Sequence, residues 1–184
     1  DIEEVLLNGN IMSENCDYFN IGGFEISDNE QLIAYGIDTI GRRNYTLKIK
    51  DLKTGEVLQD TIENTEGGNY AWAADNRSIF YMVRDQQTLL GDKVYKHILG
   101  TDPKLDELVY QEFDNQFYMG LGRLKSKKYI VIVSEQNGVS TEYQLIDANN
   151  PEKKPVTCLK RQKGHEHNLY HFEDRFFIKT NING

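Results

Sequence analysis

A pattern repeats four times along this chain of 184 residues: a short polar turn is followed by a hydrophobic strand. The turns contain Asp28, Asp75, Lys127 and Asp174, which are 47, 52 and 47 residues apart. Each full repeat holds about four segments rich in β-branched and aromatic residues, as strands are. A period of this size with about four strands is typical of β-propeller blades. The repeat therefore predicts an all-β fold of antiparallel sheets.

The spacing divides the chain into about three and a half four-stranded antiparallel blades. We place them approximately at residues 20–65, 66–115, 116–162 and 163–184, the last being incomplete. All of residues 1–184 then form part of one β-propeller domain. Because a propeller typically has about 4–8 blades, we expect the chain to be a piece of a longer protein. Helix should be scarce, since no long segment carries an apolar stripe at helical spacing.

Three local patterns give further expectations. Residues 4–7 form a short apolar run that predicts a strand, followed by a polar stretch that could form a turn of helix. Asn137-Gly138 joins two apolar segments and is typical of a type I′ hairpin turn. Trp72, Phe80 and Tyr81 could form a ligand platform, but we interpret them as core residues because inner-strand aromatic residues usually pack in the interior.

Charge and cysteine content limit the classes of function. With 21 basic and 29 acidic residues, the net charge of −8 disfavours nucleic-acid binding and weakly favours cationic ligands such as basic peptides. The apolar runs are too short to span a membrane. Cys16 and Cys158 lie far apart and form no zinc motif, so they suit a reducing compartment, although a single long-range disulfide stays open.

Two constellations could bind a metal or a phosphate group. His165, His167 and His171 would share one face of an extended strand, with Glu166 beside them. A metal site is one interpretation, but we favour ordinary blade histidines. Residues 120–123 (Gly-Leu-Gly-Arg) look like part of a phosphate loop, but they lack the third glycine and the following helix. We therefore expect no metal and no cofactor.

Several motifs occur in a familiar order. They are Gly41-Arg42-Arg43-Asn44-Tyr45 with residues 52–55, residues 72–76 with 80–84, Val94 to Thr101, residues 126–129, His165-Glu166-His167, and residues 175–181. Together they resemble oligopeptidase B, also called protease II, of the prolyl oligopeptidase family. The resemblance implies a parent in which a propeller covers an α/β-hydrolase domain. That domain would use a Ser-His-Asp triad to cut short peptides after Lys or Arg.

The resemblance places the chemistry outside this chain. The G-x-S-x-G nucleophile elbow is missing from the sequence, so we predict no catalytic residue here and an inactive isolated segment. The propeller would gate access and close over the hydrolase domain of the same parent chain. The nearest alternative is a prolyl oligopeptidase that cuts after Pro, and a further one is a non-enzymatic propeller that binds partners. We expect a cytoplasmic protein, with possible self-association of the fragment.

The resemblance also suggests which residues take part in domain closure. Two positions match those that the family associates with interdomain ion pairs. One is Asp17, before Tyr18-Phe19, where the family more often has Glu. The other is Arg43, which has Arg42 as its neighbour. Arginine suits this role because its planar fork can hold a carboxylate at two points. The alternative is that Arg42 and Arg43 merely form a solvated turn between strands.

Overall fold

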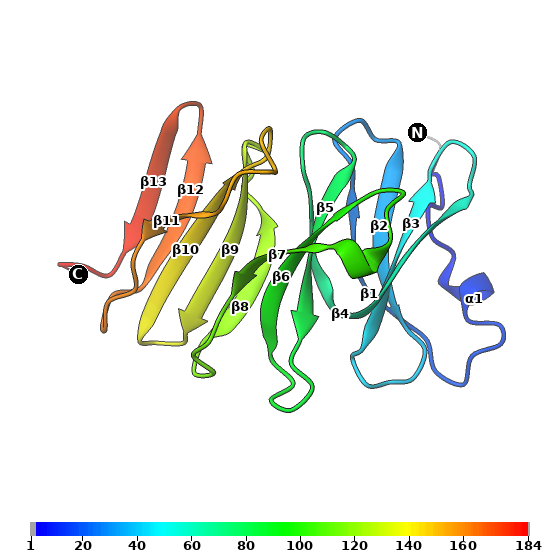
Figure 1. Ribbon diagram of the computed structural model, residues 1–184, viewed down its shortest axis with the longest axis horizontal. Coiled ribbons are helices and arrows are strands. Elements are labelled where there is room, and N and C mark those ends of the chain that lie inside the picture. The colour runs from blue at the N-terminus through cyan, green and yellow to red at the C-terminus, as the bar shows by residue number, and fades with distance from the viewer. Residues whose placement is uncertain (1–2, 184) are drawn as a thin grey trace.

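The computed structural model describes residues 3–183, and antiparallel strands make up most of it (Figure 1). In this part of the chain the helical elements are one turn of α-helix, α1 (Gly9–Met12), and a 3-10 turn, η1 (Pro103–Leu105). The strands are β1 (Asn20–Ile26), β2 (Leu32–Asp38), β3 (Tyr45–Asp51), β4 (Val57–Trp72), β5 (Ser78–Arg84), β6 (Gly91–Ile98), β7 (Glu107–Gln111), β8 (Tyr118–Arg123), β9 (Tyr129–Gln136), β10 (Ser140–Asp147), β11 (Val156–Leu159), β12 (His167–Phe172) and β13 (Arg175–Thr180).

The sheets follow one another along the chain. Strands β1 to β7 pair in sequence order, β8 to β11 form a four-stranded sheet, and β12 pairs with β13. The seven-stranded sheet is two blades that share β4, since the first part of β4 pairs with β3 and its last part pairs with β5. The blades are thus β1–β4, β4–β7, β8–β11 and the hairpin β12–β13, arranged side by side in Figure 1. The predicted all-β arrangement of antiparallel blades is confirmed.

Strand β4 crosses the boundary that the sequence placed after residue 65. Its pairing is irregular between Thr65 and Tyr70, where the strand leaves β3 and joins β5. Gly68 adopts a φ of 78° there, and a Cβ atom at Gly23 would lie only 2.5 Å from the Gly68 Cα atom. Glycine is needed at this crossing because two backbones approach each other closely. One continuous strand therefore connects the outer edge of one blade to the inner edge of the next.

Alternating side chains of β5 fill two separate cores. Ile79 and Tyr81 belong to the cluster between the first two blades, whereas Phe80 and Met82 belong to the cluster between the second and third. All four are at most 4% exposed. A strand that is buried on both faces explains the uninterrupted apolar run of β5. Trp72 is buried beside it and donates its indole N–H to the Glu25 carbonyl at 3.1 Å, so the predicted core role of the aromatic residues is confirmed.

A buried histidine connects the strands of the second blade. His97 on β6 places Nδ1 2.8 Å from Asp106 and Nε2 3.0 Å from Asp60 on β4. The fully buried ring therefore connects two carboxylates that come from different segments of the blade. Burial alone would raise the pKa of Asp60. The hydrogen bonds that Asp60 forms with the Gly100 N–H and with His97 outweigh burial, so its pKa is lowered. Burial and the bond to Asp106 raise the pKa of Tyr81.

The predicted strand at residues 4–7 is wrong. These residues have no sheet partner. Leu6 and Leu7 instead lie beside Ile21 and Ile33 of the first blade, and the Lys50 ammonium donates to the Leu6 carbonyl at 2.8 Å. Leu6 and Leu7 are half-buried and Val5 is exposed, so partial burial and one hydrogen bond take the place of strand pairing in this segment.

The predicted type I′ turn at Asn137-Gly138 is also wrong. Gln136 pairs with Ser140, which leaves a loop of three residues. Only Gly138 has a positive φ, of 72°, whereas a type I′ turn requires it at both central residues. The single glycine in the left-handed region fits a three-residue hairpin instead. The glycine-rich residues 120–123 lie within β8 and form no phosphate loop.

Candidate functional site

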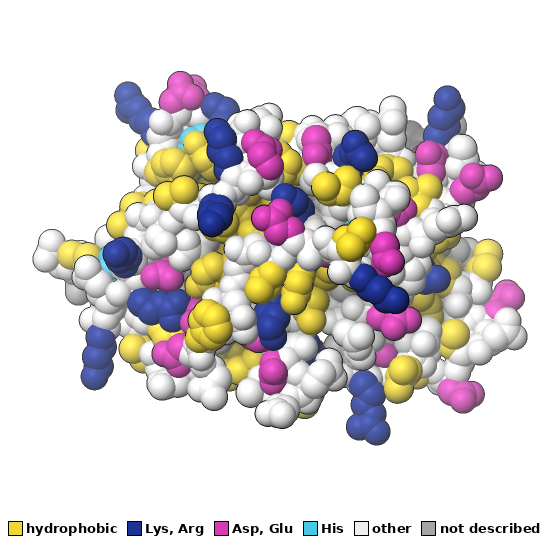
Figure 2. Space-filling model, viewed as in Figure 1, with side chains coloured by type: hydrophobic (Ala, Val, Ile, Leu, Met, Phe, Trp, Pro, Cys, Tyr) yellow, Lys and Arg dark blue, Asp and Glu magenta, His cyan; other side chains and the backbone are white. Residues whose placement is uncertain are grey.

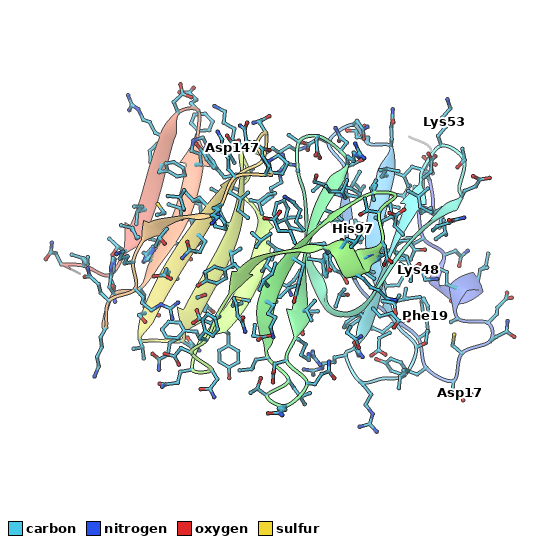
Figure 3. The ribbon with its side chains drawn as sticks, in the orientation of Figure 1. Asp17, Phe19, Lys48, Lys53, His97 and Asp147 are labelled. Carbon is cyan, nitrogen blue, oxygen red and sulfur yellow. The ribbon has the colours of Figure 1, made fainter. Side chains whose placement is uncertain are left out.

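The loop that carries Arg42 and Arg43 joins β2 to β3 at the lower end of the first blade in Figure 1. Since strands alternate in direction, the β5–β6 and β9–β10 loops lie at the same end. Figure 3 shows Asp17 at this lower end, while Lys53 and Asp147 lie at the upper edge. The candidate closure residues therefore share one end of the blades.

Asp38 fixes the shape of this loop. Its side chain is buried at the end of β2, with the residue 1% exposed. One carboxylate oxygen accepts the N–H groups of Ile40 and Gly41, each at 2.9 Å, and the other accepts the N–H of Arg43 at 2.8 Å. Burial raises the pKa of Asp38, but these backbone hydrogen bonds outweigh burial and hold its pKa below the ordinary value. The loop is thus wound around an ionised carboxylate.

The second blade supports the same loop through an ion pair. Arg84 on β5 forms a two-point contact with Glu66, at 2.8 Å from Nε and 3.0 Å from Nη2. Its remaining Nη1 donates to the Arg42 carbonyl at 3.3 Å. The hydrogen bonds that Arg84 donates to Glu66 raise the pKa of Arg84. A planar guanidinium with both ends occupied holds the loop in one position relative to the second blade.

Tyr45 fills the space behind the loop. Its ring lies between the backbones of Gly22 and Gly67, where added Cβ atoms would fall 2.2 Å and 2.6 Å from ring carbons. The Tyr45 hydroxyl donates to Asn20 at 3.1 Å. Neither glycine could carry a side chain without displacing the ring, so the Arg-Arg-Asn-Tyr motif is built into the contact between the first two blades.

The three predicted closure residues are all exposed. In the described part of the chain, no ion pair forms at Asp17, Arg42 or Arg43, and the structure does not join Asp17 to either arginine. Arg43 adopts a left-handed φ of 54°. The Tyr18 ring comes within 3.4 Å of where a Gly41 Cβ atom would be, so the Asp17 segment packs against the loop. For residues 3–183, the arginines lie in a solvated but rigidly supported turn.

Sequence reasoning missed the residues that support the loop. Asp38 could have been found, since an aspartate that begins a turn containing glycine commonly accepts the following N–H groups. Glu66 and Arg84 gave no such signal because they are 18 residues apart and meet only in the folded chain. The motif identified the exposed Arg42 and Arg43, but not the side chains that hold their loop in place.

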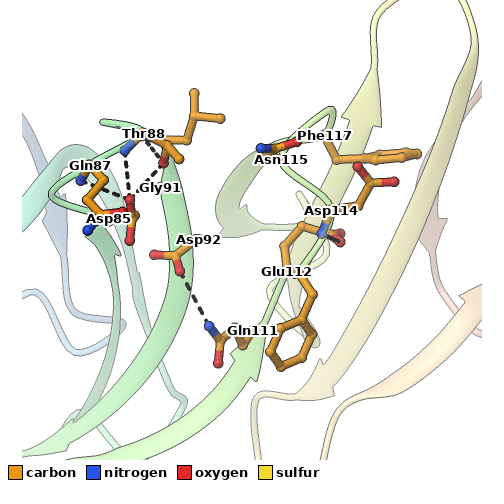
Figure 4. A pocket seen from close by; sticks show the side chains of 12 residues that line it. Asp85, Gln87, Thr88, Gly91, Asp92, Gln111, Glu112, Asp114, Asn115 and Phe117 are labelled. Carbon is orange, nitrogen blue, oxygen red and sulfur yellow. Dashed lines mark hydrogen bonds between the residues drawn. The ribbon is translucent and has the colours of Figure 1, made fainter.

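A polar hollow of about 250 Å³ lies between the β5–β6 hairpin and residues 112–117 (Figure 4). Its carboxylates are mostly occupied by the chain itself. Asp85 accepts the N–H groups of Gln87 and Thr88, and Glu112 is paired with Arg161 at 2.6 Å. In residues 3–183 no three potential metal-ligating side chains form a group. We therefore do not treat the hollow as a cation site.

The face drawn in Figure 2 carries charges of both signs without a continuous basic patch.

The sequence profile described as "Prolyl oligopeptidase, N-terminal beta-propeller domain" matches residues 1–184. The chain belongs to the prolyl oligopeptidase family. Among family members it is 42% identical over 182 residues to dipeptidyl aminopeptidase BI of Pseudoxanthomonas mexicana, covering 99% of this chain and 25% of that protein. It is 31% identical over 180 residues to Protease 2 of Moraxella lacunata, covering 97% of this chain and 26% of that protein.

Solved structures show the same fold. Oligopeptidase B from Leishmania major matches with a TM-score of 0.88 at 23% identity, over 97% of this chain and 25% of that one. Oligopeptidase B from Trypanosoma brucei, with covalently bound antipain, matches with a TM-score of 0.84 at 24% identity, over the same shares of each chain. The chain spans about a quarter of the length of these prolyl oligopeptidase relatives. The resemblance predicted from the motifs is confirmed, and this chain is propeller sequence of the prolyl oligopeptidase family.

No helix within residues 3–183 has both the length and the apolar character needed to cross a membrane.

Proposed function

We propose that this chain is the propeller segment of a serine oligopeptidase resembling oligopeptidase B. It would gate substrate access and close over a Ser-His-Asp hydrolase domain that cleaves short peptides after Lys or Arg. The observation that carries the proposal is the rigid loop that presents Arg42 and Arg43 without an ion-pair partner in the described residues. A supported loop with free guanidinium groups is suited to binding carboxylates on a facing domain.

The support of the loop matters for this role. A flexible arginine would lose conformational entropy on pairing, and a surface ion pair would then contribute little, about 0–1 kcal/mol. Here the Arg43 backbone is fixed by Asp38, and the Arg42 carbonyl is fixed by Arg84. Preorganisation lowers the cost of closure. Asp17 offers the opposite charge nearby, so the same end of the blades could contact a basic group as well.

Relatives favour two substrate classes. The likeness to Protease 2 and the net charge of −8 support a parent that acts on short basic peptides. The 42% identity to dipeptidyl aminopeptidase BI supports a second candidate, a parent that releases dipeptides from free N-termini. The full-length protein should be assayed with blocked substrates ending in Arg, Lys or Pro and with unblocked dipeptide substrates. Preference for blocked Arg and Lys substrates would support the first candidate, and preference for unblocked dipeptides the second.

The closure role is tested with Arg43→Ala in the full-length protein. We expect kcat/KM for a short peptide to fall about tenfold, which corresponds to about 1.4 kcal/mol of lost closure energy. Arg77→Ala is the matched control because Arg77 is also exposed but lies at the upper end of the blades. Unchanged kcat and KM in Arg43→Ala would contradict the closure role.

The isolated 184-residue chain should show no peptidase activity in the same assay. Peptide cleavage by this segment alone would contradict the proposal, and a full-length protein without peptidase activity would favour a binding propeller instead. We also propose a cytoplasmic location. The proposal is supported by Cys16 and Cys158, which are both free thiols, as is usual in reducing compartments.

A further inference from the structure

Three histidines line the contact between the third blade and the β12–β13 hairpin. His167 and His171 alternate with Leu169 on the inward face of β12, and they are 3% and 7% exposed. His165 precedes the strand and is 9% exposed. We call His165, His167 and His171 the histidine seam. Its position on one face follows from the two-residue period of an extended strand.

The rings pack against aromatic side chains. The His167 ring centroid lies 4.8 Å from that of His165 and 5.3 Å from that of Tyr143 on β10. The His171 ring centroid lies 4.9 Å from that of Tyr129 on β9 and 4.6 Å from that of Phe176 on β13. These contacts supply packing but no fixed counter-charge.

The seam leaves polar atoms unpaired. Among the described residues, both ring nitrogens of His167 and Nδ1 of His171 are buried without a hydrogen-bond partner. His165 differs, since its Nε2 lies 2.9 Å from the Thr180 hydroxyl. A buried polar atom without a partner destabilises the contact it lies in.

The surroundings of the seam contain few charged groups. Tyr143 faces His167 from β10, and Tyr129 faces His171 from β9. The turn at the end of β12 adds the ion pair Lys128–Asp174, at 3.1 Å. Other ionisable side chains on these segments, none of which is hydrogen-bonded to His167, are Glu135 on β9, Glu142 and Asp147 on β10, Tyr170, Glu173, Arg175 and Lys179 on the hairpin, and Glu166, whose carboxylate accepts the Gly138 N–H.

Protonation of His167 is unfavourable while its ring is buried. Burial, and then the neighbouring His165, lower the pKa of His167. A buried imidazolium without a carboxylate partner is costly, whereas a solvated histidine accepts a proton near pH 6.5. The detached hairpin therefore binds protons more readily than the docked one. Docking is strongest above about pH 6.5 and weakens as the pH falls below that value.

The hairpin is also the smallest unit in the fold. Within residues 3–183 it has two strands, and every residue of β13 is exposed. A two-stranded hairpin is marginally stable unless it packs on another element. Its attachment to β10 includes one isolated bridge, between Ser140 and His165. A small change in the interaction energy of the histidine seam can therefore alter how stably the β12–β13 hairpin packs on the β9–β10 sheet.

We propose that the histidine seam is an acid-sensitive joint, at which acidification releases the β12–β13 hairpin from the β9–β10 sheet while the other blades stay folded. This inference is independent of the proposed peptidase function. His97 provides an internal contrast, since it is equally buried but both of its nitrogens meet carboxylates. Acidification to pH 5.5 should leave that network intact because the ordinary pKa of Asp is about 4.

Amide hydrogen exchange of the 184-residue chain tests the joint at pH 7.5 and 5.5, corrected for intrinsic exchange rates. We expect protection of residues 167–180 to fall about tenfold at pH 5.5, because this pH lies about one unit below the ordinary histidine pKa and only the detached hairpin would then protonate His167. Protection of β5 should not change. Equal protection of the hairpin at both pH values, or an equal loss in β5, would overturn the proposal.

The variant His167→Phe keeps an aromatic ring but cannot be protonated, so its hairpin should stay protected at pH 5.5. The same acid-induced loss in this variant would assign the effect to other groups and overturn the role of His167. Ring titration of the wild-type chain by NMR is a second measurement that does not depend on the folding of a variant. His167 should titrate below pH 6.5, with the Tyr143 resonances changing at the same midpoint, and titration at or above 6.5 would contradict the proposal.

Discussion

At the scale of single residues, Asp38 and His97 show how a buried polar side chain is made stable by its hydrogen-bond partners. Asp38 uses both carboxylate oxygens to hold three backbone N–H groups, and His97 lies between two carboxylates. Each group connects parts of the backbone that hydrophobic packing alone would leave unrestrained. Removing one member of such a set leaves the others buried and unpaired.

We expect Asp38→Asn to lower the free energy of unfolding by about 1–3 kcal/mol, because the new amide nitrogen would face the Arg43 N–H. Urea unfolding measures this loss, and hydrogen exchange should locate it in residues 39–44. Asp51→Asn is the matched control, since Asp51 holds two N–H groups through a single oxygen that asparagine retains. An equal loss in both variants would contradict the explanation.

The same carboxylate predicts a pH dependence. The pKa of Asp38 is lowered in the folded chain, so its stabilising contribution is complete above the unfolded pKa of about 4. The contribution is lost as the pH falls through the lower folded value. The difference in unfolding free energy between wild type and Asp38→Asn should therefore shrink below about pH 4, and a constant difference between pH 7 and pH 3 would count against it.

His97→Leu should destabilise the chain by about 3–5 kcal/mol, since it leaves the side chains of Asp60 and Asp106 buried without the ring that joins them. A triple variant that adds Asp60→Asn and Asp106→Asn should recover much of the loss because the unpaired charges are gone. Thermal and urea unfolding of the two variants provide the comparison. If the triple variant is as unstable as the single one, the loss comes from packing and not from charge.

At the scale of elements, the sequence predicted strands where the apolar pattern is regular. The alternation in β3 matched the structure because its burial follows the two-residue period of a strand, and the apolar run of β5 matched because that strand is buried on both faces. The continuity of β4 could not be predicted. Residues 63–68 (Glu-Asn-Thr-Glu-Gly-Gly) are polar and glycine-rich, so they indicate a break, yet the neighbouring blade supports them.

The candidate site, like the strands, was predicted only in part from the sequence. The motif indicated Arg42 and Arg43, but nothing local indicated that Glu66 and Arg84 hold their loop. Contacts between strands of different blades depend on the folded arrangement, which a single sequence does not contain.

The Tyr45 contact between blades gives a prediction at this scale. Gly67→Ala should lower stability by about 1–3 kcal/mol, because its Cβ would lie 2.6 Å from the Tyr45 ring and force it to move. Gly122→Ala in β8 is the control, since nothing lies within 4 Å of its added Cβ. Combining Gly67→Ala with Tyr45→Ala should cost less than the sum of the two, and strict additivity would show that the two positions do not interact.

At the scale of the whole molecule, the far side of the hairpin exposes apolar rings. Tyr170, Phe172 and Phe177 are 54%, 66% and 51% exposed, and Tyr170 and Phe177 are paired across β12 and β13. We expect the 184-residue chain to self-associate through this face. Phe177→Lys should weaken association about tenfold in sedimentation velocity, whereas Phe113→Lys, at an 85% exposed loop position, should not. Equal effects of both substitutions would exclude the hairpin face.

Strand β4 has a practical consequence for anyone who wishes to dissect this domain. A chain cut after residue 65 would keep the β3 pairing in one product and most of the β5 pairing in the other, but it would separate the two blades whose side chains form one shared core cluster. The smallest excisable module at this end is therefore a pair of blades, and a protein engineer who transplants residues 20–65 alone should obtain an unfolded peptide.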